Sequence, residues 1–389
     1  MQINNKNILL RSDFNEPIKD SELLSTKRID ANLNTIHELL TKKNKLVLIS
    51  HHSDKGQTLL PVYNYIKKIL SETNPKINFV YINSTDERVV SEYFLQNKNN
   101  LPEVILLENT RLFDNKLDEN NDKDFAKFLS SFADYFVYDA FSVAHRDHAS
   151  TTGVAKILPS CFGLTFIKEY TNLKKLLDEA DKTLIFMGGA KLSTKLPIVE
   201  KFLDKGSIVC LGGAMTHDIL KHREVDIKES YLEEGFTLSE NILNKLNAQI
   251  ETSKLILPKD IIWNVKAKEN PNTKIVDSVF DTKKIKELML QNNIKNILWN
   301  GPVGMYENGE VGGSINIYNF IKDINKKQSS NDVVQEIFSV VGGGDTLTFL
   351  ENEKKDFEKD FSYVSLSGGA MLTFLSDGTL PVLKMINVD

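Results

Sequence analysis

Short apolar runs alternate with amphipathic segments along most of the chain. In residues 28–42 apolar side chains recur at the three- and four-residue spacing of a helix, whereas "LVLIS" at 46–50 is the near-continuous apolar run of a buried strand. Such an alternation predicts an α/β fold, in which helices cover both faces of a parallel sheet. The chain has 389 residues, more than one hydrophobic core usually organises, so we expect two domains.

The same pattern gives the expected elements. In the first part we predict strands near 7–11, 45–50, 77–82, 103–107 and 134–138, and helices near 28–42, 59–71, 86–97 and 121–132. Between about 150 and 168 the pattern lapses into a stretch rich in small residues, Gly and Pro, which we interpret as a hinge. A helix near 168–180 follows, and strands are predicted near 183–187, 207–211, 253–257, 274–277, 295–299, 338–341 and 362–366.

Composition excludes several classes of protein. The net charge of −5 argues against a nucleic-acid partner held by overall basicity. Cys161 and Cys210 form no CxxC pair, so neither a disulfide framework nor a zinc site is indicated, and a reducing cytosol fits. The first residues carry too short an apolar run for a signal peptide, and no stretch has the roughly 18 apolar residues of a membrane span.

The second half repeats one sequence pattern, in which an apolar run is followed by a glycine pair and a helix-like segment. It occurs as "LIFMGGAKLS", "IVCLGGAMTH", "SVVGGGDTLTF" and "VSLSGGAMLTF". In a parallel sheet these turns lie at the carboxyl edge, where ligands bind. One such turn is more often a packing feature than a binding site, but four at one edge favour backbone N–H groups that hold phosphates. No GxxxxGK[ST] occurs, which excludes a P-loop.

Lys191 and Lys195 stand at the start of the helix after the first of these turns. If Thr194 caps that helix, Pro197 falls in its first turn, where a missing N–H does no harm. A cation is unfavourable at this positive end of the helix dipole, by roughly 0.3–1 kcal/mol each, unless an anion lies nearby. The two lysines therefore indicate a ligand with negative charge.

Other candidate residues follow the predicted strands. Asp345 comes after three glycines and is either an N-cap or a ligand of a magnesium ion that accompanies phosphates. Asn300, Gly301 and Glu307 follow another strand, and Glu307 could accept hydrogen bonds from ribose hydroxyls. Arg28, Arg111 and Arg146 stand near strand or loop ends in a chain that otherwise prefers lysine, which favours bidentate binding of phosphate or carboxylate. The remaining candidates in this part are His51, His52, His145 and His148, although a histidine at a strand end is more often a hydrogen-bonded structural residue. Asp13 and Asn15 either stabilise a turn or hold the hydroxyl groups of a small polar substrate.

Together these motifs resemble phosphoglycerate kinase over nearly the whole chain. "RSDFNEP", "LENTR", "DAFSVAHRDHAST", "GGAKLSTK", "WNGPVG" and "GGGDT" occur in the order of that family. The resemblance implies two Rossmann-like, doubly wound parallel-sheet domains joined by a hinge. It places a phosphoglycerate-binding domain at 1–155 plus about 375–389, a hinge and interdomain helix at 156–180, and a nucleotide-binding domain at 181–374.

The resemblance also implies a reaction and its residues. The reaction is reversible phosphoryl transfer between 1,3-bisphosphoglycerate and MgADP, giving 3-phosphoglycerate and MgATP, in line within a closed interdomain cleft, by a cytoplasmic monomer without nucleic-acid or membrane partners. Catalysis would rest on Arg28, Lys195, Gly343 and Gly369. The phosphoglycerate would be bound by Asp13, Phe14, Asn15, Arg28, His51, Arg111 and Arg146. The nucleotide would be bound by Lys191, Lys195, Asn300, Glu307, Gly343, Gly344, Asp345 and Thr346, with Asp345 on Mg²⁺.

Three positions depart from the family pattern. Asp54 stands where the family carries a substrate-binding arginine, with Lys55 as a less rigid substitute. The loop before Phe280 lacks a customary Gly-Pro, and Ser367 replaces a customary glycine. These departures leave two alternatives to an active enzyme of this type. One is a nucleotide-binding protein without turnover, and the other is a kinase for a different small acid.

Overall fold

The computed structural model describes residues 2–54, 56–113, 116–265, 271–328, 336–354 and 356–388. The chain divides into two compact units, one formed by Met1–Thr171 with Thr379–Asp389 and the other by Asn172–Gly378. Each unit contains a six-stranded, entirely parallel sheet. The α/β fold expected from the pattern of apolar positions is therefore confirmed.

The sheet of the first unit has the strand order β5-β6-β4-β1-β7-β8. Its strands are β1 (Asn7–Arg11), β4 (Lys45–Ile49), β5 (Phe79–Ile82), β6 (Val104–Leu107), β7 (Tyr135–Tyr138) and β8 (Ser160–Phe162). The main helices are α1 (Lys27–Thr41), α2 (Leu60–Thr73), α3 (Glu87–Gln96) and α4 (Lys123–Ser130). Shorter elements are β2 (Ile18–Lys19), β3 (Glu22–Leu23), η2 (Phe141–Val143), η3 (Ala149–Gly153) and η8 (Pro381–Lys384).

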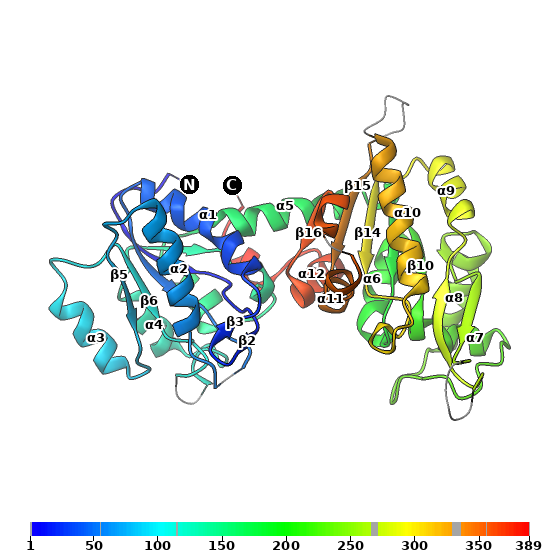
Figure 1. Cartoon of the computed structure of the whole chain (residues 1–389), viewed down its shortest axis with the longest axis horizontal. Coiled ribbons are helices and arrows are strands. Elements are labelled where there is room, and N and C mark those ends of the chain that lie inside the picture. The colour runs from blue at the N-terminus through cyan, green and yellow to red at the C-terminus, as the bar shows by residue number, and fades with distance from the viewer. Residues whose placement is uncertain are drawn as a thin grey trace. The chain divides into compact units, whose positions relative to one another are not determined.

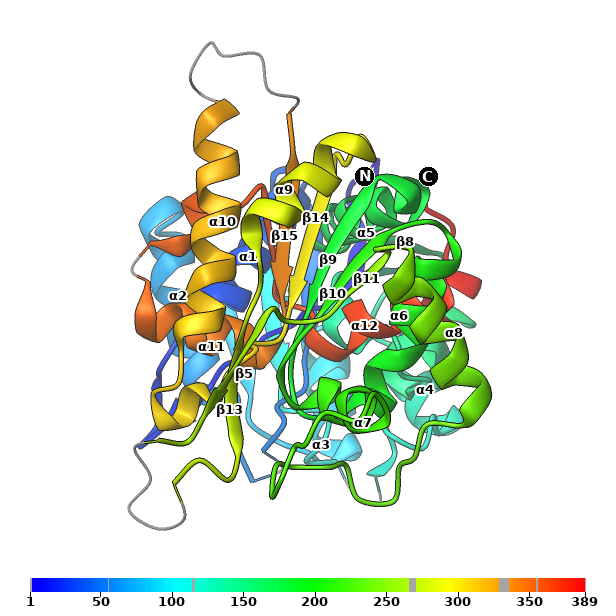
Figure 2. The same cartoon turned by 90° about the vertical axis from the view of Figure 1, so that its right-hand side faces the viewer.

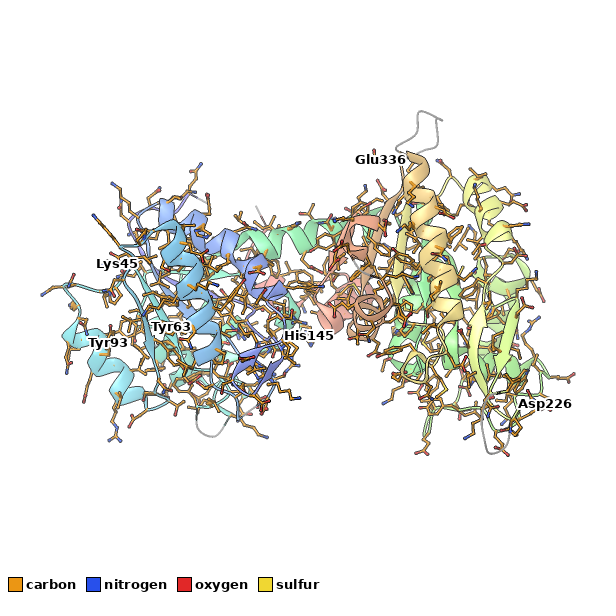
Figure 3. All side chains as sticks on the ribbon, in the orientation of Figure 1. Lys45, Tyr63, Tyr93, His145, Asp226 and Glu336 are labelled. Atoms are coloured by element: carbon orange, nitrogen blue, oxygen red, sulfur yellow. The ribbon has the colours of Figure 1, made fainter. Side chains whose placement is uncertain are left out.

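One face of this sheet is closed by α1 and α2 (Figure 1). Ile29 and Ile36 of α1 and Ile66 of α2 pack with alternate residues of β1 and β4 in one fully buried cluster. Because side chains of a strand point alternately to opposite faces, the remaining strand residues serve the other face. At the edge of the sheet is Tyr63 of α2, which is labelled in Figure 3. Its ring centroid lies 4.8 Å from that of Phe79 and 5.5 Å from that of Tyr81.

The sheet of the second unit has the order β11-β10-β9-β14-β15-β16, visible side by side in Figure 2 for its first five strands. Its strands are β9 (Thr183–Met187), β10 (Ile208–Leu211), β11 (Leu255–Ile256), β14 (Asn296–Asn300), β15 (Phe338–Gly342) and β16 (Tyr363–Ser365). The helices are α6 (Leu192–Asp204), α7 (His217–His222), α8 (Glu240–Glu251), α9 (Thr282–Gln291), α10 (Gly312–Gln328), α11 (Gly344–Glu353) and α12 (Gly368–Asp377). The short helices are η4 (Ala180–Lys182), η5 (Gly213–Thr216), η6 (Tyr306–Asn308) and η7 (Phe357–Asp360).

The four glycine turns follow β9, β10, β15 and β16, so their predicted place at one carboxyl edge is confirmed. From β9 the chain proceeds to β10 and β11 on one side and then returns to β14 on the other. This reversal is a topological switch point, where the loops after two neighbouring strands diverge and leave a crevice for a ligand.

Three local predictions are corrected. The stretch 150–168 is not irregular, because it contains most of η3, the edge strand β8 and the start of α5 (Leu164–Asp178). The predicted strand at 274–277 is β13 (Ile275–Val279), which lies outside the large sheet and pairs antiparallel with β12 (Asp260–Trp263), a strand that we did not predict. Short strands at an edge carry too little apolar periodicity to be recognised.

The start of α6 is the third correction. The helix begins at Leu192 with Lys191 as N-cap, so Thr194 is not the cap and Pro197 lies in the second turn. The hydroxyl of Thr194 instead donates a hydrogen bond to the carbonyl oxygen of Lys191, at 3.1 Å. Lys191 and Lys195 still lie at the positive end of the helix, so the argument for an anionic ligand is unchanged.

Trp299 of β14 provides a test of the second core. Its side chain is fully buried, and its indole N–H donates to the carbonyl oxygen of Gly301, at 3.0 Å. We expect Trp299→Ala to lower the free energy of unfolding of this unit by about 3–5 kcal/mol, measured by urea unfolding followed by circular dichroism. The exposed control Leu290→Ala should change it by less than about 0.5 kcal/mol. Coincident unfolding curves for Trp299→Ala and wild type would contradict this assignment of the core.

Candidate active site

The first group of predicted residues gathers at the carboxyl edge of the first sheet. Asp13 follows β1 and His51 follows β4, which are neighbouring parallel strands. Two hydrogen bonds join the loops that continue from these strands. The backbone N–H of Phe14 donates to Oγ of Ser50 (3.0 Å), and the N–H of Ser53 donates to Oδ1 of Asn15 (2.8 Å). The phenyl ring of Phe14 is fully buried in the core, so only its backbone belongs to the site.

Arg28 lies in the first turn of α1, where a cation is unfavourable. Its guanidinium donates to Oδ2 of Asp13 at 2.9 Å, with the two side chains 29% and 10% exposed. Oδ1 of Asp13 accepts from the N–H of Asn15, at 3.2 Å. Asp13 therefore both stabilises the turn, as we considered, and holds the guanidinium of Arg28. Arg28 is held in place while part of it stays accessible.

His51 is surrounded by positive charge. It is buried, and Nη2 of Arg11 lies 3.2 Å from its Nδ1. Burial first, and then the charges of Arg11, Arg111, Arg146 and Arg28, hold the pKa of His51 well below its ordinary value. The imidazole is therefore neutral near pH 7. Because the arginine can only donate, Nδ1 is the acceptor and the ring proton is on Nε2.

Arg111 and Arg146 complete this cluster of guanidinium groups. Burial and the charge of Arg146 lower the pKa of Arg111, whereas Glu119, with an oxygen 3.5 Å from Nε, opposes the change. Within the part of the chain that the structure describes, the guanidinium of Arg146 forms no ion pair or hydrogen bond. Burial also lowers the pKa of His145 and of His148. Such a gathering of cations favours a small anion as the ligand.

Sequence reasoning missed the residues that support this cluster. Arg11 is completely buried, and its Nε donates to Oγ of Ser150 (3.1 Å), which in turn donates to Asp118 (3.0 Å). Glu16, also buried, accepts a hydrogen bond from the backbone N–H of Arg28, at 2.5 Å. It stabilises the start of α1, because the N-cap Thr26 makes no side-chain cap bond. The one sequence signal for such a supporting residue was the position of Arg11 at the end of a predicted strand.

Asp54 stays outside this network of cations. Its side chain is exposed, and its Oδ1 accepts from the N–H of Gly56 at 2.9 Å, which stabilises the local turn. His52 is buried, and its Nε2 lies 2.9 Å from the carbonyl oxygen of Glu16. We therefore interpret it as a structural residue. Lys55, the predicted substitute for the missing arginine, lies outside the described residues.

The second group of predicted residues lies at the switch point of the second sheet. Nζ of Lys195 donates to the carbonyl oxygen of Gly188 at the end of β9 and is 3.5 Å from that of Asn300 at the end of β14. Burial lowers the pKa of Lys195 to about 8, and the charge of Asp345 opposes this change. The ammonium group therefore lies at the carboxyl ends of two adjacent strands.

The backbone around this lysine is tightly constrained. Nδ2 of Asn300 donates to the carbonyl oxygen of Gly342 (2.8 Å), and Oγ1 of Thr346 accepts from the N–H of Gly301 (2.7 Å). Gly301 has φ +93°, and a Cβ there would overlap the carbonyl oxygen of Gly188 and approach Nζ of Lys195 to 2.7 Å. Only glycine fits at this position. Of the predicted residues, Lys195, Asn300 and Thr346 therefore form one network.

Beside this network is a pocket of about 310 Å³, lined by residues from several loops. Both Asp345, in the first turn of α11, and Glu307, in η6, contribute to its wall and are exposed. The described residues contain no group of three or more side chains able to hold a metal ion by themselves. A single exposed carboxylate fits Mg²⁺ that arrives with phosphate oxygens, since that ion usually keeps water and takes one or two carboxylates.

The remaining predicted residues lie at the same edge without joining the network. Lys191 and Gly344 are exposed, Gly343 (φ +103°) caps α11, and Gly369 is exposed in the first turn of α12. Ser367 has φ −95°, a conformation open to any residue, so the backbone does not require glycine there. Phe280 is buried against Phe186, with ring centroids 5.7 Å apart. Among the described residues no helix is long and apolar enough to cross a membrane.

Comparisons with known proteins identify the family of this chain. The family model of phosphoglycerate kinase matches residues 1–378. The phosphoglycerate kinase of Finegoldia magna is 32% identical over all of this chain and 98% of its own length, and that of Dictyoglomus turgidum is 34% identical over 98% and 95%. The solved structure of phosphoglycerate kinase from Coxiella burnetii is 28% identical and superposes with a TM-score of 0.79, covering 99% of this chain and 96% of that one.

These matches run over nearly the full length of this chain and of its relatives. The chain therefore belongs to the phosphoglycerate kinase family and catalyses the reversible transfer of a phosphoryl group between 1,3-bisphosphoglycerate and ADP, a reaction of glycolysis.

Proposed function

We propose that the first unit binds 3-phosphoglycerate or 1,3-bisphosphoglycerate and that the second binds the nucleotide. The observation that supports the first assignment is the cluster of guanidinium groups around buried, neutral His51. A phosphate and a carboxylate on a small hydroxy acid match such a cluster, since arginine binds both groups bidentately. The hydroxyl group of the substrate then donates a hydrogen bond to the carboxylate of Asp13 and accepts one from the amide of Asn15. The full proposed set is Asp13, Phe14 through its backbone, Asn15, Arg28, His51, Arg111 and Arg146.

The nucleotide is proposed to lie along the carboxyl edge of the second sheet. Lys195 and the N–H groups at the start of α11 face the phosphates, and Glu307 accepts hydrogen bonds from the ribose. Asp345 would hold Mg²⁺, which neutralises charge on the phosphate oxygens when it is bound. The full proposed set is Lys191, Lys195, Asn300, Glu307, Gly343, Gly344, Asp345 and Thr346.

Transfer of the phosphoryl group needs positioning and charge stabilisation rather than covalent help from the protein. Arg28 from one unit and Lys195 from the other are proposed to hold the equatorial oxygens of the group in flight. The N–H groups near Gly343 and Gly369 would donate to the same oxygens. Because an acyl phosphate hydrolyses in water, we propose that the transfer occurs in line within a cleft that closes between the units. We also propose a cytoplasmic monomer, as the family resemblance implies, and the net charge of −5 argues against a nucleic-acid partner held by overall basicity.

Arg28 gives the direct test of this mechanism. In a coupled assay with MgATP and 3-phosphoglycerate, Arg28→Ala should lower kcat about 10²–10³-fold, because a donor to the transition state is lost. Arg88→Ala removes a guanidinium whose side chain is 88% exposed on α3 and should retain wild-type kcat. Circular dichroism of both variants checks the fold. Full activity of a folded Arg28→Ala variant would disprove the assigned role.

Asp54 tests whether the departure from the family pattern weakens substrate binding. Asp54→Arg adds a cation and removes an anion near the arginine cluster, and we expect the KM for 3-phosphoglycerate to fall about threefold to tenfold at this exposed position. Asp54→Asn removes the anion alone and should give an intermediate KM. If neither substitution changes the KM in titrations at constant ionic strength, Asp54 does not influence the substrate.

Lys195 predicts a pH dependence. Burial lowers its pKa to about 8, so the amine of the nucleotide-free enzyme is charged below that pH and loses its charge above it. The kcat/KM for MgATP should therefore fall above about pH 8, approaching roughly tenfold per pH unit. Lys195→Arg stays charged and should remove this fall, whereas exposed Lys221→Arg should keep the wild-type profile. A wild-type profile that is flat to pH 9.5 would refute the assignment.

A further inference from the structure

The pocket of about 310 Å³ beside Lys195 extends across several strand ends. Asp345 follows β15, whereas His217 follows β10, and the strands β14 and β9 lie between them. Neighbouring strands are about 4.8 Å apart, so the two residues mark positions separated by roughly 14 Å along the edge. This inference rests on the proposed function: if the phosphates lie near Asp345 and Lys195, the base of the nucleotide lies toward His217.

His217 presents one defined group to this end of the pocket. Its Nδ1 lies 2.7 Å from the carbonyl oxygen of Tyr231. A carbonyl oxygen can only accept, so Nδ1 carries the proton and the neutral ring leaves Nε2 as an acceptor. Burial lowers the pKa of His217, which keeps the ring neutral near pH 7.

His217 is one of the residues of the pocket wall. The side chain is only 2% exposed and yet lines the pocket together with Tyr231 and Val276. Nδ1 is occupied, and over the described residues Nε2 has no hydrogen-bond partner in the protein. His217 therefore places an unpaired acceptor beside the proposed base, in a wall otherwise formed largely by backbone and apolar groups such as Ala214 and Ile275.

We propose that Nε2 of His217 accepts a hydrogen bond from the exocyclic amine of adenine and thereby selects adenine nucleotides over purine nucleotides with a carbonyl oxygen at position 6. Adenine offers a donor there, whereas guanine and hypoxanthine offer an acceptor. With guanine or hypoxanthine, the carbonyl oxygen at position 6 would face Nε2 of His217, so the hydrogen bond is lost and two acceptors repel each other. His217 would therefore both favour adenine and disfavour the other two bases. His217 is a specificity-determining residue and takes no part in the transfer itself.

The wild-type enzyme supplies the first test. With 3-phosphoglycerate saturating, kcat/KM is measured for the magnesium complexes of ATP, purine riboside triphosphate and inosine triphosphate, which differ in the substituent at position 6. We expect the order ATP, purine riboside triphosphate, inosine triphosphate, with ATP favoured over inosine triphosphate by about tenfold to a hundredfold. Inosine triphosphate used as well as ATP would overturn the proposal.

A matched pair of variants supplies the second test. His217→Phe keeps an aromatic ring and removes the acceptor, so the preference for ATP over inosine triphosphate should fall to within about threefold. His222→Phe makes the same change at the exposed end of α7 and should keep the wild-type preference. An unchanged preference in folded His217→Phe would overturn the proposal, and if this variant does not fold, the wild-type series decides.

These results are distinguishable from a failure of the proposed function. Absence of turnover with all three nucleotides would count against the assigned nucleotide site, and calorimetric binding of ADP and IDP to the whole protein would then make the same comparison of bases. Equal turnover of the adenine and hypoxanthine nucleotides would leave the kinase function intact and refute the role of His217 alone. In the absence of turnover, equal binding of ADP and IDP would refute that role.

Discussion

The burial of positive charge is the constraint on which both sites depend. Four guanidinium groups act on one buried imidazole in the first unit, and a buried ammonium group lies against backbone carbonyls in the second. Such arrangements are unfavourable in an empty protein and become favourable when an anion arrives. The surrounding structure is organised to hold the charges in spite of this, through Asp118 and Ser150 behind Arg11, Asp13 beside Arg28, and the crossing hydrogen bonds of Asn300 and Thr346.

Parallel topology is the means by which these charges come together. Asp13 and His51 lie far apart in the sequence, as do Lys195 and Asn300, yet each pair follows neighbouring strands that point the same way. The loops at such an edge lie on one side of the sheet, and they leave a crevice for a ligand where the order of strands reverses. The sheets therefore supply a rigid base, while the short loops above them carry the chemistry.

The sequence alone was sufficient to predict the long helices and strands and to select most of the charged residues proposed for the sites. Apolar periodicity located the strands β1, β4 and β9, because buried parallel strands leave an uninterrupted apolar run. It failed for β8 and β12, which are short and lie at edges or in a ribbon. It also could not reveal the roles of Glu16, Arg11 and His217, since these depend on hydrogen bonds to groups that are distant in the sequence or outside any motif.

The return of residues 379–388 to the first unit affects how the protein is made. The short helix η8 in this segment contacts η3, which carries Ser150, the hydrogen-bond partner of Arg11. During synthesis on the ribosome the second unit is therefore complete in sequence before the first unit has all of its parts. The unit that emerges first is finished after the second, and its arginine cluster reaches its final support only once residues 379–388 have followed the second unit out of the exit tunnel.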